Sequence, residues 1–204
     1  MIEHILYINL DSRKDRKERI EKVLENLPYE RFPATLYEPG CIGASMSHIR
    51  ALEYAIEKKW DHVLIMEDDM EWNDFDKNYL KLLELMKNPY DVIVLGGILV
   101  SYNPETSKLH KCNSMGAYLV SKHYYETLLK NFKEGLQKLI YEINKPLPLW
   151  GILRKSKNIE YRIDIYWHRL QSKDNWFIIP LCYSLPGYSD ISKKEVNWQP
   201  LFLK

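Results

Sequence analysis

The chain has 204 residues, 46% hydrophobic and 28% charged, so it is long enough for one globular domain with a sizeable core. Its 29 basic and 28 acidic residues leave a net charge of +1, which gives no electrostatic case for nucleic acid as the main partner. The three cysteines are widely spaced and form neither a disulfide framework nor a zinc pattern, so we expect a reducing compartment.

Neither a signal-peptide pattern nor an apolar run of membrane-spanning length is present in the sequence. We therefore expect a soluble, cytoplasmic protein, whose association with a membrane would need a partner. The abundance of Lys, Ile, Tyr and Asn is typical of an AT-rich genome, and for a viral source the compartment would be the host cytoplasm.

The N-terminal segment predicts a buried strand over residues 5–10 and a charged helix from about Arg13 to Asn26. Basic residues, Arg13 and Arg16 among them, crowd the first helical turns, where the helix dipole disfavours cations. A diphosphate bound at the strand-to-helix turn would explain them. The alternative is a solvated helix face with ion pairs between residues three and four positions apart.

The next segment predicts a short edge strand over Arg31–Tyr37 and a helix with regular apolar spacing from Met46 to about Lys59. His48 falls in the first turn of that helix. A histidine in such a place is more often a packed structural residue than a catalytic one.

The most informative stretch is the apolar run Val63–Met66, which ends abruptly in Glu67, Asp68 and Asp69. The run predicts a buried strand, and ligands of open α/β sheets bind at the carboxyl ends of strands. Three adjacent carboxylates repel one another, and a hard cation such as Mg²⁺ or Mn²⁺ would offset this repulsion. The alternative is a solvated acidic turn.

The second half of the chain continues to alternate strands and helices. A helix begins near Phe75 and ends before Pro89, and a helix capped by Ser121 ends at Gly135. Residues 136–157 predict an excursion over the surface, and Asp164 lies near the start of a short helix. The remaining predictions are strands over 91–97, 115–120 and 176–181 (the last strand), a polar loop or hairpin over 102–111, a turn over 186–190 and a tail over 196–204 that packs back on the domain.

This alternation predicts an α/β fold in one domain, with a mostly parallel sheet flanked by helices. The glycine-rich motifs of dinucleotide-binding and P-loop proteins are absent, as are the nucleophile elbow and the zinc-protease motif. The paired glycines Gly96 and Gly97 at the end of one strand indicate a turn or room for a ligand.

Four motifs, in this order and spacing, resemble glycosyltransferase family 25, which includes bacterial lipooligosaccharide galactosyltransferases and procollagen galactosyltransferases. The resemblance covers residues 5 to about 130, and the segments 163–164 and 189–191 are similar to the C-terminal part of the family. The motifs are Tyr7-Ile8-Asn9-Leu10-Asp11-Ser12-Arg13 with Arg16, Gly40-Cys41 leading to Ser47-His48, Leu64-Ile65-Met66-Glu67-Asp68-Asp69, and Gly116-Ala117-Tyr118-Leu119-Val120.

The resemblance implies a GT-A-like, Rossmann-like fold and an inverting, metal-dependent transfer of a hexose from a UDP-sugar to a hydroxyl of a glycan or glycoprotein. Galactose or glucose is the expected sugar, and Mn²⁺ or Mg²⁺ is the expected cofactor. Residues 1–120 would form the half that binds the nucleotide-sugar, and residues 121–204 the acceptor side. The acceptor pocket would come from loops 98–112 and 136–160, with Trp150 and Trp167 as sugar platforms or ordinary core-edge residues.

The acidic triplet then takes the role of the family's D-x-D motif, with Asp69, assisted by Asp68 or Glu67, holding the metal on the donor diphosphate. The triplet departs from a literal D-x-D, which leaves open which carboxylates contact the metal. Asp164 is the first candidate for the base that deprotonates the acceptor, and Asp190 is the second or completes the metal shell. The candidate donor-binding residues are Asn9, Leu10, Asp11, Arg13, Arg16, His48, Glu67, Asp68, Gly116 and Ser189.

Two other functions fit parts of the sequence. A catalytically inactive nucleotide-sugar or glycan-binding module could have the same fold, since fold does not guarantee activity. A metal-dependent phosphohydrolase would need a nucleophilic aspartate after the first strand, and Asp11 is placed for it. The second acid of that motif is missing, because its position is occupied by Arg13.

Overall fold

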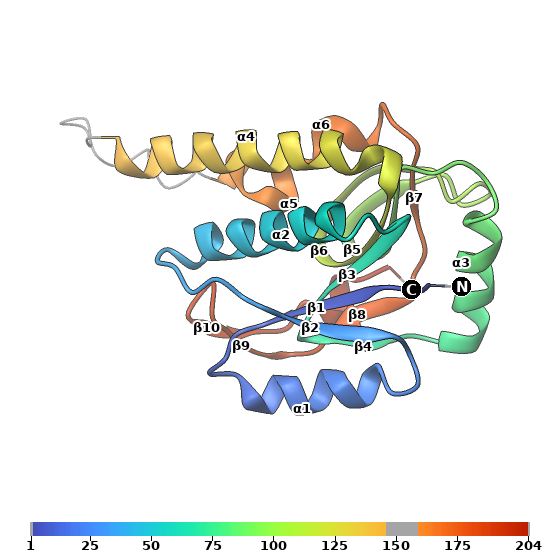
Figure 1. Cartoon of the computed structure of the whole chain (residues 1–204), viewed down its shortest axis with the longest axis horizontal. Helices are drawn as coiled ribbons and strands as arrows, with labels where there is room; N and C mark the ends of the chain where they lie inside the picture. Colours follow the sequence, from blue (N-terminus) through green and yellow to red (C-terminus); the bar gives the residue numbers. More distant parts are fainter. Residues whose placement is uncertain (1, 146–158, 204) are drawn as a thin grey trace.

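The structure is a computed structural model that describes residues 2–145 and 159–203. Six strands form a central sheet in the order β2-β1-β3-β6-β5-β7 (Figure 1). Strand β6 is antiparallel to both neighbours and the other five run in one direction, which confirms the mostly parallel α/β fold. The strands are β1 (Ile5–Asn9), β2 (Tyr29–Pro33), β3 (His62–Glu67), β5 (Val92–Tyr102), β6 (Leu109–Ser121) and β7 (Trp176–Ile178).

Helices cover both faces of this sheet (Figure 1). Side chains alternate along β1, so that Leu6 and Ile8 join one core and Ile5 and Tyr7 join the other. Helices α2, α4, α5 and α6 pack on the first core, and α1 and α3 pack on the second. Their bounds are α1 Lys14–Val23, α2 Gly40–Glu57, α3 Phe75–Leu85, α4 Tyr125–Asn144, α5 Ile163–Tyr166 and α6 His168–Gln171.

Short strands bring the C-terminal part of the chain to the carboxyl end of the sheet. The sequence predicts 176–181 as the last strand, which is wrong because three short strands follow β7. The tail packs back as expected, since buried Phe202 pairs with Ile98 of β5. These additional strands are β4 (Met70–Trp72), which pairs with β8 (Cys182–Ser184), and β9 (Gly187–Ser189), which forms a hairpin with β10 (Lys194–Val196).

Two predicted helix boundaries are wrong. Helix α4 does not end at Gly135 but continues to Asn144, so residues 136–144 are helical and not part of a surface excursion. The glycine serves packing instead, because the Tyr166 ring would lie 2.8 Å from a Cβ atom there. Helix α2 begins at Gly40, six residues before the predicted start at Met46, so His48 lies in the middle of the helix.

The paired glycines of β5 serve packing against another segment of backbone. A Cβ atom on Gly96 would lie 2.1 Å from the carbonyl oxygen of Cys182, so only a glycine allows β8 to approach so closely. The edge strand β2 is displaced from the predicted 31–37 and covers Tyr29–Pro33. In the part of the chain that the structure describes, no helix is both long enough and apolar enough to span a membrane.

Candidate active site

A cleft of about 560 Å³ opens at the carboxyl ends of β1 and β3. Its walls combine residues that follow these strands with residues of the β9–β10 hairpin and the tail, so both ends of the chain contribute. Most of the candidate residues predicted from the sequence line it. These are Leu10, Arg16, His48, Glu67, Asp68, Asp69, Gly116, Asp164, Ser189 and Asp190.

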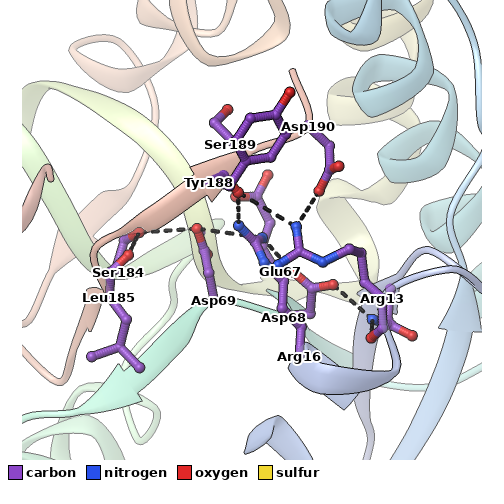
Figure 2. A network of polar contacts seen from close by, with 12 residues as sticks. Arg13, Arg16, Glu67, Asp68, Asp69, Ser184, Leu185, Tyr188, Ser189 and Asp190 are labelled. Atoms are coloured by element: carbon purple, nitrogen blue, oxygen red, sulfur yellow. Dashed lines mark hydrogen bonds and ion pairs between the residues drawn. The ribbon is translucent and has the colours of Figure 1, made fainter. Parts of the chain in front are cut away.

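Asp68 is fully engaged by protein groups. Its Oδ2 accepts a hydrogen bond of 2.7 Å from Nδ2 of Asn9, and its Oδ1 accepts one of 2.8 Å from Arg16 (Figure 2). Burial raises the pKa of Asp68, and the Arg16 charge only partly opposes this. Because both carboxylate oxygens already have partners, Asp68 acts as the anchor that fixes Arg16 at the cleft wall.

Asp69 presents an oxygen without a partner. Its Oδ2 accepts a hydrogen bond of 3.0 Å from Ser184 and lies 3.8 Å from Arg16, whereas its buried Oδ1 has no hydrogen-bond partner (Figure 2). Burial and the neighbouring charge of Glu67 raise the pKa of Asp69 to about 7. A buried polar atom without a partner is costly, so a ligand or ion that reached this oxygen would remove that cost.

Glu67 is the end of a buried chain of polar groups. His48 lies between Glu67 and Tyr118, with Nε2 3.3 Å from Oε1 of Glu67 and Nδ1 2.9 Å from the Tyr118 hydroxyl. Although burial opposes ionisation, the hydrogen bond and charge of His48 lower the pKa of Glu67. An ionised Glu67 only accepts, so Nε2 of His48 donates to it. Glu67 is thus held in one orientation at the cleft.

The two candidate bases have different surroundings. Asp190 is bound to Arg13, whose Nη1 lies 2.5 Å from its Oδ2 (Figure 2). Burial and the charge of Glu67 raise the pKa of Asp164, which accepts a hydrogen bond from the Ser114 backbone. Asp164 lies in the first turn of α5, as predicted. Asp190 is therefore occupied by an arginine, whereas Asp164 accepts from a backbone N–H, and this contrast separates the two.

The other predicted residues lie around the cleft. Asn9 is buried below Asp68, Asp11 is bound by Arg31 at 2.5 Å outside the lining, and Arg13 is held by both Asp15 and Asp190. Gly116 lines the cleft, and its missing side chain makes room for Met70, whose sulfur would lie 2.3 Å from a Cβ atom.

Several polar groups in the cleft are not predicted from the sequence. The backbone carbonyl of Tyr188 accepts a hydrogen bond of 2.6 Å from Arg16, and Ser184 contacts Asp69. A backbone carbonyl has no signature in sequence, and Ser184 lies 115 positions from its partner. Trp167, a candidate sugar platform, is fully buried and packs edge-on to Tyr118, while Trp150 lies outside the described residues.

The residues of the cleft supply some, but not all, of the ligands that a divalent cation needs. Among the described residues, no group of three or more His, Cys, Asp or Glu side chains could by itself hold a metal. Asp69 does offer a free oxygen, and Glu67 lines the same cleft. Mg²⁺ usually binds through one or two carboxylates together with substrate phosphates, so this donor set matches a cation that arrives with a diphosphate.

Comparisons with known proteins support the fold. No family model matches the sequence, and no curated protein matches it. A glycosyltransferase involved in glycosylating the major capsid of PBCV-1 shares 12% identity over 95% of this chain and 97% of that one, with a TM-score of 0.52. The glycosyltransferase GlyE of Streptococcus pneumoniae shares 12% identity over 87% of this chain and 45% of that one, with a TM-score of 0.47. The first likeness shows a GT-A-like fold.

Proposed function

We propose that the protein is a glycosyltransferase that moves a sugar from a nucleotide-sugar to a hydroxyl acceptor. The observation that carries this proposal is the Asp69 carboxylate, whose Oδ1 has no partner and whose Oδ2 lies 3.8 Å from Arg16, in a cleft at the carboxyl ends of β1 and β3. This edge of an α/β sheet is where nucleotide ligands bind. A cationic guanidinium and a carboxylate with a free oxygen are together suited to a diphosphate with its cation.

The donor lies on the β1 side of the cleft in this proposal. Leu10 lines that wall, and Arg16 is held in place there by Asp68 and by the carbonyl of Tyr188. Such fixed positive charge stabilises a leaving nucleoside diphosphate. Following the resemblance to family 25, we propose a UDP-hexose as donor, with galactose or glucose as the sugar.

Asp69, with Glu67, would hold Mn²⁺ or Mg²⁺ against the donor. The cation would supply Lewis-acid stabilisation of the departing diphosphate. Asp68 holds Arg16 in this arrangement, since Asn9 and Arg16 each donate to one of its oxygens. The three acids of the triplet therefore divide their roles, with one anchoring an arginine and two facing the ligand.

Asp164 is the proposed base. Its raised pKa lies nearer the working pH than that of an ordinary aspartate, which is the condition for efficient general base catalysis. It would take the proton of the acceptor hydroxyl as that oxygen attacks the anomeric carbon opposite the leaving group, so that the configuration inverts. Asp190, bound to Arg13, instead positions the hairpin over the donor side.

A donor screen tests the function. UDP-, GDP- and CMP-sugars are added with Mn²⁺, and the midpoint of thermal unfolding (Tm) and the release of nucleotide are measured. A donor at about 100 times its Kd should add ~2.7 kcal/mol of stability, which corresponds to a Tm increase of about 5–11 °C for a domain of this size. Binding without hydrolysis or transfer would identify an inactive binding module, and no binding of any nucleotide-sugar would disprove the proposal.

A further inference from the structure

Exposed apolar side chains gather around the cleft. Among the described residues, most of the large hydrophobic side chains that are exposed line this one cleft. Single exposed apolar residues are normal, but a group of them around a cleft marks a binding surface. The group consists of Leu36, Tyr37, Leu99, Ile191, Trp198 and Leu201.

The order of the sheet divides the cleft into two sides. Leu10 and Arg16 follow β1, whereas Leu99 belongs to β5, and strands β3 and β6 lie between these two positions. The acids that follow β3 are therefore central. With the donor on the β1 side, the β5 side is left for the acceptor. Asp164, whose carboxylate is bound by the backbone of Ser114 next to β5, lies on this acceptor side.

The tail forms the outer wall of the acceptor side. Phe202 is buried and pairs with Ile98, and the backbone N–H of Leu203 donates to the carbonyl of Gly97 at 3.0 Å. The turn before this anchor presents Trp198 and Leu201, which are 45% and 49% exposed. The anchor fixes the tail, so both side chains stay at the cleft although neither contributes much to the core.

Both the backbone conformation and the exposure of Leu99 disfavour a leucine at this position. Its φ of 52° is left-handed, and no other hydrophobic residue in the described part of the chain has a positive φ. It is also 66% exposed. A leucine in this conformation is strained, and its exposed side chain gains little from burial. Strained residues gather at functional sites, and a ligand that covers Leu99 would make use of its side chain.

We propose that Leu99, Trp198 and Leu201 form a subsite for an apolar aglycone, so that the acceptor is a glycoside with its sugar at Asp164 and an apolar group on these three residues. This inference rests on the proposed function, because it assumes the donor on the β1 side. The tryptophan ring and two leucines match an alkyl or aromatic group, and they offer no charge for an ionic partner.

The test compares octyl and methyl glycosides of galactose, glucose and mannose below the micelle concentration. Binding is measured by calorimetry and, with the donor found in the screen, KM is measured as well. Burying about two methylenes, at ~0.8 kcal/mol each, should make the octyl glycoside bind at least ten-fold more tightly. Equal affinities would overturn the inference. Because binding needs no turnover, an inactive protein that prefers the octyl glycoside would disprove only the proposed catalysis.

Leu99→Asn and Leu80→Asn form a matched pair of variants. Asparagine tolerates a left-handed backbone, so Leu99→Asn should fold at least as stably as the parent protein. We expect it to lose most of the octyl preference. Leu80 is 68% exposed on α3 outside the cleft, and its variant should keep that preference in full.

Two further outcomes would overturn the proposal. One is a full octyl preference in Leu99→Asn. The other is binding of the protein to phosphatidylcholine vesicles with no preference for the monomeric octyl glycoside, which would identify the apolar residues as a lipid contact.

Discussion

At the residue scale, the most informative group is the Asp69 carboxylate. Its surroundings disfavour the ionised form. Burial and the charge of Glu67 raise its pKa to about 7, compared with about 4 in an unfolded chain. The native state therefore prefers the protonated acid, and this preference destabilises the protein progressively as the pH rises from about 4 to about 7. A cation at Asp69 would reverse the balance, since it favours the ionised form.

Asp69→Asn should therefore stabilise the metal-free protein at pH 7 while it abolishes transfer. A pKa difference of one between the folded and unfolded states corresponds to ~1.4 kcal/mol. Each kcal/mol corresponds to a Tm change of about 2–4 °C. We therefore expect the Tm of the variant in EDTA to exceed that of the parent protein by several degrees. The gain should shrink as the pH falls from 7 to 4. Thermal unfolding as a function of pH measures it.

Added Mn²⁺ with donor should then stabilise the parent protein and leave the Asp69→Asn variant unchanged. Asp61→Asn is the control, because this exposed aspartate is paired with Lys122 and its pKa is lowered by that partner. Removing its charge should not stabilise the protein at pH 7. An Asp69→Asn protein that transfers sugar normally with the metal chelated would contradict the proposed role.

The choice of base is tested by two matched variants. Asp164→Asn should lower kcat by ~10²–10⁴-fold with little change in donor affinity, since it removes the proton acceptor alone. Asp190→Asn should mainly weaken donor binding, because it releases Arg13 from the hairpin. Steady-state kinetics with donor and acceptor varied separately will measure both effects. An unchanged kcat in the Asp164 variant removes that residue as the base.

At the scale of elements, the sequence predicts strand cores well and boundaries poorly. The apolar runs of β1 and β3 are visible because burial on both faces makes them continuously hydrophobic. Gly135 misleads because a glycine past a run of helical spacing usually ends the helix, whereas here it is required by the distant Tyr166 ring. A glycine in a sequence can be required by backbone conformation or by close packing, and the sequence alone does not distinguish these two causes.

Gly96→Ala tests the packing cause in β5. The added Cβ atom would meet the carbonyl oxygen of Cys182 at 2.1 Å, and backbone cannot move aside as a flexible side chain can. We expect a loss of ~3 kcal/mol or more, at the upper end for overpacked sites, measured by urea unfolding. Gly187→Ala is the control, because no atom lies within 4 Å of the corresponding Cβ position. Equal stability of the two variants would contradict the packing described here.

At the scale of the whole molecule, the cleft joins the two ends of the chain. Arg16 contacts Asp68, 52 positions away, and the carbonyl of Tyr188, 172 positions away. The first contact joins two segments that the sequence marks by charge, and these segments were predicted to lie near the same phosphates. The second depends on backbone geometry in the β9–β10 hairpin, for which the sequence predicts only a turn.

Donor binding should therefore protect both ends of the chain at once. With UDP-sugar and Mn²⁺, we expect slower amide hydrogen exchange in residues 10–16 and in residues 185–196, because the ligand stabilises the arginine contacts that join them. Helix α3, which lies outside the cleft, should exchange as before. Mass spectrometry of peptic fragments measures this, and protection confined to residues 10–16 would show that the hairpin does not take part.

The contact between Arg16 and Tyr188 also affects when the site can form during translation. At a synthesis rate of ~5–20 residues per second, the ribosome adds Tyr188 roughly 10–35 s after Arg16. In the later part of this interval, once Asp69 has been added, the nascent chain contains all three acids of the triplet but lacks the hairpin and the tail that complete the cleft. A nascent chain that stops before the β9–β10 hairpin should therefore be unable to capture donor, and binding competence should appear only once these strands have been made.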